Sequence, residues 1–327
     1  MKAMVVPKLG GPDVLEMRAL PEPTPGERDL LVEVHATAVN PKDCHMRQHG
    51  LGERLALPFV LGYDVSGVVR GVGAAVTLFK EGDAVYASPS LVRPGANAEW
   101  VLVDERLAGP KPDNVDHAHA AALPLVTITA WESLHHRAHL HTGETVLIHA
   151  GAGGVGHIAI QLAKLHGCRV ITTASRRESI EQCARLGADV VINYAEQDVV
   201  EQVREATDGR GCPVVLDTVG GDVFVQSMRC LAPHGRLVTL LPPPADAPVH
   251  KLFSRSATLA LEFMSATTLH HTRLAGQGEA LRTVTELVEA DKLKVHVSHV
   301  FPLAELPEAH RQQETRHTMG KIVVTVK

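Results

Sequence analysis

The middle of the chain alternates short apolar runs with stretches in which apolar residues recur at helical spacing. The unbroken apolar run at 146–148 is typical of a strand buried on both faces. After a glycine cluster, residues 155–163 place apolar side chains three or four positions apart, which predicts a helix. The pattern recurs downstream, with strands expected at 169–174, 189–192, 213–216, 235–240 and 258–263 and helices at 177–186, 199–207 and 223–231. Strands separated by helices predict an α/β fold with a doubly wound parallel sheet, whose six strands follow the dinucleotide-binding order.

The two ends of the chain have a different pattern of short strands and turns. A strand is expected at 30–36, after a turn rich in proline and glycine. Near the C-terminus, the spacing predicts a helix at 278–290 and strands at 294–301 and 322–326. Residues 117–138 have a helical rhythm that Pro124 interrupts. Irregular β-rich structure is therefore expected on both sides of the alternating middle.

Length and composition narrow the class of protein. With 327 residues, the chain exceeds the usual size of one hydrophobic core, so two domains are expected. The formal net charge is −5, so the excess of basic residues typical of nucleic-acid-binding proteins is missing. No apolar run is long enough for a membrane span. The chain has five cysteines and no C-x-x-C pair, which favours free thiols in a reducing compartment. Its first residues lack the apolar core of a signal peptide, so a cytoplasmic location is expected.

A glycine-rich turn joins the first strand of the middle region to its helix. The segment Gly151-Ala152-Gly153-Gly154-Val155-Gly156 fits G-x-G-x-x-G in the strand-turn-helix context that gives this motif weight. Gly151 is expected to permit the tight turn, Gly153 to let a pyrophosphate approach the backbone, and Gly156 to let the helix pack closely. The N–H groups at the helix start would face the phosphates. The alternative is an ordinary turn without a ligand.

One histidine pair has a spacing that suits a metal. His135 and His139 stand four apart and could share a face of a helix, but no cysteine or carboxylate accompanies them in a ligand pattern. A solvated helix end is the alternative, and no metal site is expected in the chain.

Four segments spread over nearly the whole chain resemble a known family. They are Asn40-Pro41-Lys42-Asp43 with Arg47 and Gly50, residues 61–69, residues 150–156, and residues 320–324. The chain resembles the medium-chain dehydrogenase/reductase superfamily, and within it the zinc-free quinone oxidoreductase branch that includes zeta-crystallin. The resemblance implies a GroES-like catalytic domain, residues 1–120 plus 268–327, into which a Rossmann dinucleotide-binding domain, residues 121–267, is inserted.

The resemblance also bears on metal chemistry. Zinc-dependent relatives carry a cysteine where this chain has Asn40, and Gly-His-Glu where it has Gly62-Tyr63-Asp64. Asparagine is a poor zinc ligand and tyrosine a rare one. Relatives with a structural zinc carry four cysteines around the region that here spans 86–104, where this chain has none. Alcohol oxidation without a Lewis acid is difficult, whereas a quinone or an α,β-unsaturated carbonyl delocalises the incoming charge itself.

The end of the second sheet strand indicates which nicotinamide is bound. Sites that prefer NAD carry an acidic residue there, about 20 residues past the first glycine. This chain instead has Ser175, Arg176 and Arg177, and a guanidinium suits a 2′-phosphate, so NADPH (NADP+) is expected. The alternative is that both arginines are solvated and that NAD(H) binds equally well. Tyr194 matches a family position beside the adenosine ribose and phosphate, or is a plain surface tyrosine.

Further cofactor contacts are implied by the resemblance or follow from the sheet. Thr129 matches a family threonine near the nicotinamide, or bonds its own helix backbone. Carboxyl ends of parallel strands face the cofactor, so backbone contacts are expected at Val219, Leu240 and Leu241. Lys321 either contacts the cofactor or is a turn lysine. The expected cofactor-binding residues are Thr129, Gly151, Ala152, Gly153, Gly154, Val155, Gly156, Thr173, Ser175, Arg176, Tyr194, Val219, Leu240 and Leu241.

Three residues are candidates for the catalytic site. Asn40 and Tyr63 stand where relatives have zinc ligands, and either can donate a hydrogen bond to a substrate oxygen. His45 stands where many relatives have a tyrosine, and a histidine suits protonation of the reduced oxygen. Asp43 and Arg47 are four apart and are expected to form a structural ion pair.

These observations favour an NADPH-dependent, zinc-independent oxidoreductase that transfers hydride to a quinone or an α,β-unsaturated carbonyl, mainly by proximity and orientation. Two alternatives stay open: an NADP-binding protein with a structural or sensory role, and an NADP-linked alcohol dehydrogenase with an unusual metal site. The expected partner is a small-molecule substrate, with neither nucleic acid nor membrane. The apolar edge strand at 258–263 and the resemblance together imply a homodimer.

Overall fold

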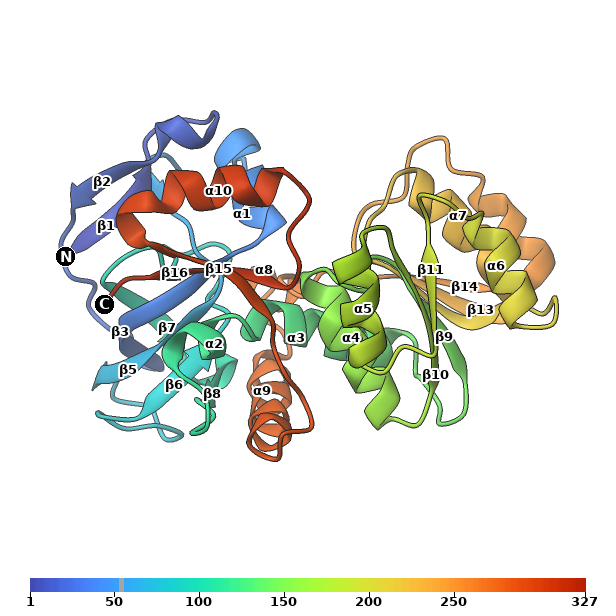
Figure 1. Cartoon of the computed structure of the whole chain (residues 1–327). Helices are drawn as coiled ribbons and strands as arrows, with labels where there is room; N and C mark the ends of the chain where they lie inside the picture. The colour runs from blue at the N-terminus through green and yellow to red at the C-terminus, as the bar shows by residue number, and fades with distance from the viewer. Residues whose placement is uncertain (53–55) are drawn as a thin grey trace. The chain divides into compact units, whose positions relative to one another are not determined.

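The computed structural model describes residues 1–52 and 56–327, and the chain divides into two compact units (Figure 1). Unit 1 consists of Met1–Ile128 and Ser265–Lys327, and unit 2 of Thr129–Met264. The helix α3 (Pro124–Trp131) contains the first boundary. Both termini therefore belong to unit 1, and unit 2 is an insertion into it.

Unit 2, described over residues 129–264 without a gap, contains a parallel sheet of six strands. In sheet order the strands are β11 (Val190–Asn193), β10 (Arg169–Ala174), β9 (Thr145–Ile148), β12 (Cys212–Asp217), β13 (Leu231–Thr239) and β14 (Thr258–Leu261). In chain order this is 3-2-1-4-5-6, so the predicted dinucleotide-binding topology is confirmed. The direction of sheet growth reverses between β9 and β12, and such a switch point is where open α/β sheets bind ligands.

The strands of this sheet are joined by helices close to the predicted positions. These are α4 (Gly154–Leu165), α5 (Arg177–Arg185), α6 (Val199–Ala206) and α7 (Asp222–Cys230). α5 ends at Arg185, and Gly187 shortly after it has a φ of +100°, the left-handed conformation that commonly ends a helix. Apolar strand residues such as Leu147, Ile171 and Val215 form one buried cluster with Phe224 of α7. The unbroken apolar runs in the sequence thus correspond to strands covered by helices.

The described parts of unit 1 form two mainly antiparallel sheets. The smaller has the order β2 (Glu16–Ala19), β1 (Lys2–Val6) and β4 (Phe59–Val60). The larger has the order β15 (Val297–Pro302), β16 (Lys321–Thr325), β3 (Asp29–Val39), β5 (Val65–Val72), β6 (Ala84–Ala87) and β8 (Ala108–Pro110), with β7 (Trp100–Asp104) also paired to β3. The α-helices in the described part of unit 1, besides the start of α3, are α1 (Pro41–His49), α2 (His117–Ala121), α8 (Ala266–Leu269), α9 (Leu274–Glu289) and α10 (Leu306–Glu314).

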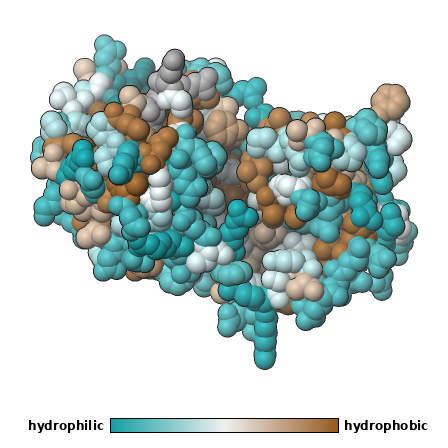
Figure 2. Space-filling model, turned by 90° about the horizontal axis from the view of Figure 1, so that it is seen from above, coloured by the Kyte–Doolittle hydropathy of each residue, from teal (hydrophilic) through white to brown (hydrophobic). Residues whose placement is uncertain are grey.

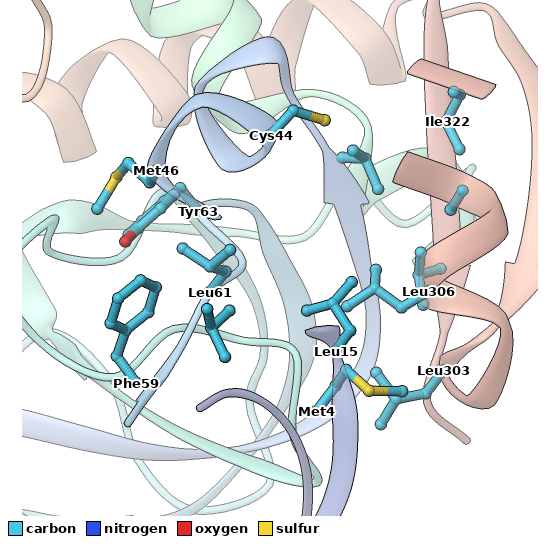
Figure 3. Close-up of a cluster of buried hydrophobic side chains, with 14 of the residues drawn as sticks. Met4, Leu15, Cys44, Met46, Phe59, Leu61, Tyr63, Leu303, Leu306 and Ile322 are labelled. Atoms are coloured by element: carbon cyan, nitrogen blue, oxygen red, sulfur yellow. The ribbon is translucent and has the colours of Figure 1, made fainter. Parts of the chain in front are cut away.

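The C-terminal segment completes the N-terminal sheet. β16 pairs antiparallel with β3, with Ile322 opposite Val39 and Thr325 opposite Ala36. One buried cluster combines Phe59, Leu61 and Tyr63 with Leu306 of α10, and Figure 3 shows these side chains facing one another across the interior. Residues from both ends of the chain therefore share one hydrophobic core.

The histidine-rich segment before β9 is less regular than predicted. Pro124 begins α3 and Glu132–Arg137 continues it as a π-helix, whereas His139 lies beyond the helix with a φ of +45°. The predicted shared helix face of His135 and His139 is therefore wrong. His135 instead lies against the rings of Trp131 and His166, with centroids 4.5 Å and 5.4 Å away.

No helix suited to a bilayer occurs in the described part of the chain. Of the helices in residues 1–52 and 56–327, none is both long and apolar enough to cross a membrane. On the face that Figure 2 presents, apolar residues are interspersed with hydrophilic ones.

Two glycines of α9 provide a matched test of packing in unit 1. A Cβ at Gly276 meets no atom within 4 Å, whereas one at Gly278 would lie 2.5 Å from the carbonyl oxygen of Arg106. We expect Gly276→Ala to raise the free energy of unfolding by about 0.5–1 kcal/mol, because alanine favours a helix. Gly278→Ala should lower it by about 1–3 kcal/mol through overpacking. Urea unfolding followed by circular dichroism measures both, and equal midpoints for the two variants would contradict the packing of α9.

Candidate functional site

The glycine turn lies between β9 and α4, at the carboxyl edge of the unit 2 sheet. Its backbone is held by Thr173 near the end of β10. The Gly151 N–H donates to the Thr173 carbonyl oxygen at 3.0 Å, and the Ala150 N–H donates to the Thr173 hydroxyl at 3.0 Å. Thr173 thus fixes the path of the turn, so the neighbouring strand and the turn form one unit.

Two glycines of the motif are needed because other atoms lie where a side chain would be. A Cβ at Gly151 would lie 2.1 Å from the Thr172 hydroxyl, and one at Gly156 would lie 2.3 Å from the Ala150 carbonyl oxygen. The left-handed residue of the turn is Ala150, with a φ of +50°, and Gly151 is not among the residues with positive φ. Gly151 is therefore required because the Thr172 hydroxyl of β10, Cys183 and Ile160 occupy the space of a side chain.

Gly153 provides the open part of the turn. It is the N-cap of α4, and a Cβ there meets only the Ala150 carbonyl oxygen, at 3.2 Å. Since glycine has no side chain to cap the helix, the N–H groups of the first turn of α4 remain available to an anion. These donors, together with the helix dipole, fit the pyrophosphate of a dinucleotide. A reduced nicotinamide bound there supplies a hydride.

The ends of β10 and β11 bring together the residues expected at the adenosine end of the cofactor. The Ser175 hydroxyl donates to the Tyr194 hydroxyl at 3.0 Å. Arg176 is exposed and forms the N-cap of α5. Arg177 is also exposed, but its Nε donates to Glu181 at 2.9 Å. Arg177 thus has a carboxylate partner within its own helix.

The ends of β12 and β13 supply the other side of the switch point. Asp217 accepts the N–H groups of Val219 and Gly220, both at 2.9 Å, which shapes the loop after β12. A Cβ at Gly220 would lie 2.9 Å from a methyl group of Leu241, so the two loops are in contact. Val219 and Leu241 expose large apolar side chains, and Leu240 is partly buried. The expected residues of this region thus lie together at the carboxyl edge.

His149 is a residue of this edge that the sequence did not single out. It follows β9, is buried, and places its Nδ1 3.5 Å from the Thr173 hydroxyl. Burial lowers its pKa to about 4, against the attraction of Asp217, so the imidazole is neutral at pH 7. Within the described residues its Nε2 has no hydrogen-bond partner. A histidine two residues before the motif was the available signal.

In unit 1, Asn40 belongs to a buried polar cluster with residues far away in the sequence. Its amide nitrogen donates to Asp64 at 2.9 Å, and its amide oxygen accepts the Lys321 ammonium at 2.5 Å. Lys321 also donates to Asp64 at 3.0 Å, and all three side chains are buried. Lys321 is therefore an interior residue, and the Asn40 side chain is occupied by contacts within unit 1.

Tyr63 is buried beside this cluster. Its hydroxyl lies 3.5 Å from the Leu91 carbonyl oxygen, and its ring packs among apolar side chains such as Met46 and Leu61 (Figure 3). Burial raises the pKa of the Tyr63 hydroxyl far above its usual value. The structure thus brings Asn40 and Tyr63 into the same region, but as interior residues.

The remaining predicted site residues have different environments. His45 lies on the exposed side of α1, with its ring 4.7 Å from that of His49. Thr129 is buried in α3, where unit 2 begins.

The predicted ion pair between Asp43 and Arg47 is wrong. Asp43 accepts the backbone N–H groups of Asn40 and Gly62, whereas Arg47 pairs with Glu314 of α10 and donates to His310. Burial raises the pKa of Asp43 to about 6, against the lowering effect of its hydrogen bond from Asn40. Arg47 thus finds its side-chain partners on α10, whereas Asp43 caps the start of α1 and also accepts from Gly62.

Possible metal ligands do not gather anywhere in the described residues. In residues 1–52 and 56–327, no group of three or more histidine, cysteine, aspartate or glutamate side chains is placed to hold a metal ion. All five cysteines are buried free thiols.

Comparison with known proteins places this arrangement in a family. The Zinc-binding dehydrogenase family matches residues 186–324, and the Alcohol dehydrogenase GroES-like domain matches residues 26–113. A quinone oxidoreductase of Pseudomonas aeruginosa is 37% identical over 325 residues, covering 96% of each chain. A zinc-type alcohol dehydrogenase-like protein of Staphylococcus aureus is 36% identical over 319 residues, covering 93% of each.

A solved structure agrees with these matches. The Escherichia coli quinone oxidoreductase complexed with NADPH is 30% identical, covers 100% of both chains and superposes with a TM-score of 0.90. The sheet order, the glycine turn and these similarities lead to one conclusion: the chain is an oxidoreductase of the medium-chain dehydrogenase/reductase superfamily, with a GroES-like and a Rossmann-type nicotinamide-binding part.

Proposed function

We propose that this protein is an NADPH-dependent, zinc-independent oxidoreductase that transfers hydride to a quinone or an α,β-unsaturated carbonyl. The glycine turn carries the proposal, because its open Gly153 and first-turn N–H groups fit a pyrophosphate. Similarity to quinone oxidoreductases of Pseudomonas aeruginosa and Rattus norvegicus supports the choice of acceptor.

The preference for NADPH is proposed from the end of β10. An acidic residue that would bond a 2′-hydroxyl is replaced there by Ser175 and Arg176. A guanidinium binds a phosphate through charge-assisted hydrogen bonds, and Tyr194 lies within hydrogen-bonding distance of Ser175. We assign the 2′-phosphate to Ser175 and Arg176 and the adenosine ribose to Tyr194. Two similar proteins whose structures were solved in complex with NADPH support the choice of this cofactor.

The choice of acceptor rests on the chemistry of unit 1. Where zinc-dependent relatives have metal ligands, Asn40 and Tyr63 offer neutral hydrogen-bonding groups with internal partners. A quinone or enone spreads the added negative charge through its own conjugated system, so it needs less help than an alkoxide. Asn40 and Tyr63 are proposed to shape the substrate site, and His45 to lie at its exposed rim.

Turnover with a panel of acceptors tests this proposal. We expect consumption of NADPH with quinones and enones, and little with simple alcohols and NADP+. Arg176→Ala should weaken NADPH binding about tenfold or more, and NADH binding little, because only NADPH has the 2′-phosphate. Fluorescence titration measures binding independently of turnover.

Arg177→Ala is the matched control, because Arg177 is the neighbouring exposed arginine and pairs with Glu181 of its own helix. It should leave the preference for NADPH unchanged. Tight binding of NADPH without turnover of any acceptor would favour a structural or sensory role, and zinc-dependent alcohol oxidation would favour an alcohol dehydrogenase.

We also propose that the protein is a homodimer joined through β14. This strand is at the edge of the unit 2 sheet, and Leu261 and Phe263 beside that edge are exposed by 57% and 48%. Phe253 is 90% exposed in the segment before β14. An open edge with apolar side chains favours pairing with a second copy.

Light scattering after size-exclusion chromatography tests the dimer. We expect the mass of two chains at micromolar concentration, and the mass of one chain for Leu261→Lys, because a lysine on an edge strand opposes pairing. A wild-type protein that elutes with the mass of one chain would contradict the proposed assembly.

A further inference from the structure

Lys42 is the second residue of α1, and the function proposed above gives it no role. Its Nζ donates to the Ser265 hydroxyl at 2.7 Å and lies 4.2 Å from the centroid of the Tyr63 ring. The side chain is only partly buried, unlike Asn40 and Tyr63. An ammonium has three N–H donors, and Ser265 is its one acceptor in the part of the chain that the structure describes. Lys42 therefore has donors left for a ligand.

The polar groups beside Lys42 have no such capacity. The Lys321 ammonium already faces three acceptors, the oxygens of Asn40, Asp64 and the Val39 carbonyl. The Asn40 amide is bonded through both its nitrogen and its oxygen. The Tyr63 hydroxyl is buried and lies near a carbonyl oxygen. Of the groups in this region, Lys42 is the one with both exposure and spare donors.

The partial burial of Lys42 brings the pKa of its ammonium closer to neutral pH. Burial lowers the pKa of its ammonium to about 8, against the attraction of Asp43 on α1 and Asp64 before β5. The Asp64 charge is already compensated by Lys321, and the Tyr63 hydroxyl stays neutral because burial raises its pKa. The Ser265 hydroxyl carries no charge. A lysine that loses its proton near pH 8 is suited to general acid catalysis.

We propose that Lys42 binds the carbonyl oxygen of the substrate and donates the proton that completes its reduction. This inference rests on the proposed function. The hydride, with its two electrons, comes from the reduced nicotinamide and forms a C–H or O–H bond in the conjugated system of the substrate. This transfer leaves a negative charge on the substrate oxygen. The oxygen then accepts a proton from the Lys42 ammonium, so that an N–H bond breaks and an O–H bond forms. The neutral amine regains a proton from water, and Ser265 holds it in position.

Two substitutions separate the charge of Lys42 from its proton. Lys42→Met removes both, and we expect kcat with a quinone to fall about 100-fold, within the range of general acid catalysis. Lys42→Arg keeps the charge, but a guanidinium does not release its proton in this range. In the wild type kcat should fall as the pH rises through about 8, because the protonated form is the donor, and both variants should lose this dependence.

A binding measurement gives a readout that does not depend on turnover. 4-Nitrophenolate resembles the oxyanion of a reduced quinone, and its absorbance reports binding to the NADP+ complex. The wild type and Lys42→Arg should bind it, whereas Lys42→Met should bind it at least about tenfold more weakly, as expected for loss of a charge-assisted hydrogen bond. Lys80→Met, at an exposed lysine of unit 1, is the control and should match the wild type in both assays.

The outcomes distinguish this inference from the proposed function. If the wild type reduces no quinone or enone, both are overturned. If the wild type is active but Lys42→Met retains its kcat, its pH profile and its phenolate affinity, the role of Lys42 alone is overturned. Loss of kcat in both variants, with phenolate binding retained by Lys42→Arg, supports it.

Discussion

A buried ion pair between Lys321 and Asp64 fixes the interior of unit 1. The two charges lie 3.0 Å apart with almost no exposure, and Asn40 bonds to both of them. A charge removed from water needs a partner, and removing one member of such a pair costs about 3–5 kcal/mol. The pair joins β16, the segment before β5 and the start of α1, so segments from both ends of the chain must be in place together. Unit 1 cannot form this interior from its N-terminal part alone.

Unit 2 depends on steric fit instead of charge. Gly151 lies against Thr172 of β10, and Gly156 against the carbonyl oxygen of Ala150, so neither position has room for a side chain. Thr173 holds the turn through its hydroxyl and its carbonyl oxygen. This packing leaves the start of α4 uncapped by any side chain, which creates the anion site. The same residues that tighten the turn therefore also create its chemistry.

The sequence predicted unit 2 better than unit 1, and the reason is physical. Buried parallel strands and their helices have local signatures, and the observed β10 and α5 begin where the pattern indicates. Hydrogen bonds of buried polar residues have no such signature. Asp43 and Arg47 stand at the spacing of a helical ion pair, yet Arg47 pairs with Glu314, which is 267 positions away. His149 was overlooked because a single histidine beside a motif resembles any strand residue.

The same limit applies to the residues at the zinc-ligand positions. Asn40 and Tyr63 are identified by alignment of motifs, but their burial follows from contacts with distant residues, Lys321 and Leu91, that the motifs do not reveal. Position 64 retains a carboxylate, and a buried carboxylate requires a compensating cation. Lys321 provides that cation from β16 with each of its donors engaged. The charge of Asp64 is therefore compensated within unit 1 by Lys321. The neutral side chains of Asn40 and Tyr63 fit beside this pair because they add no charge that would need a partner.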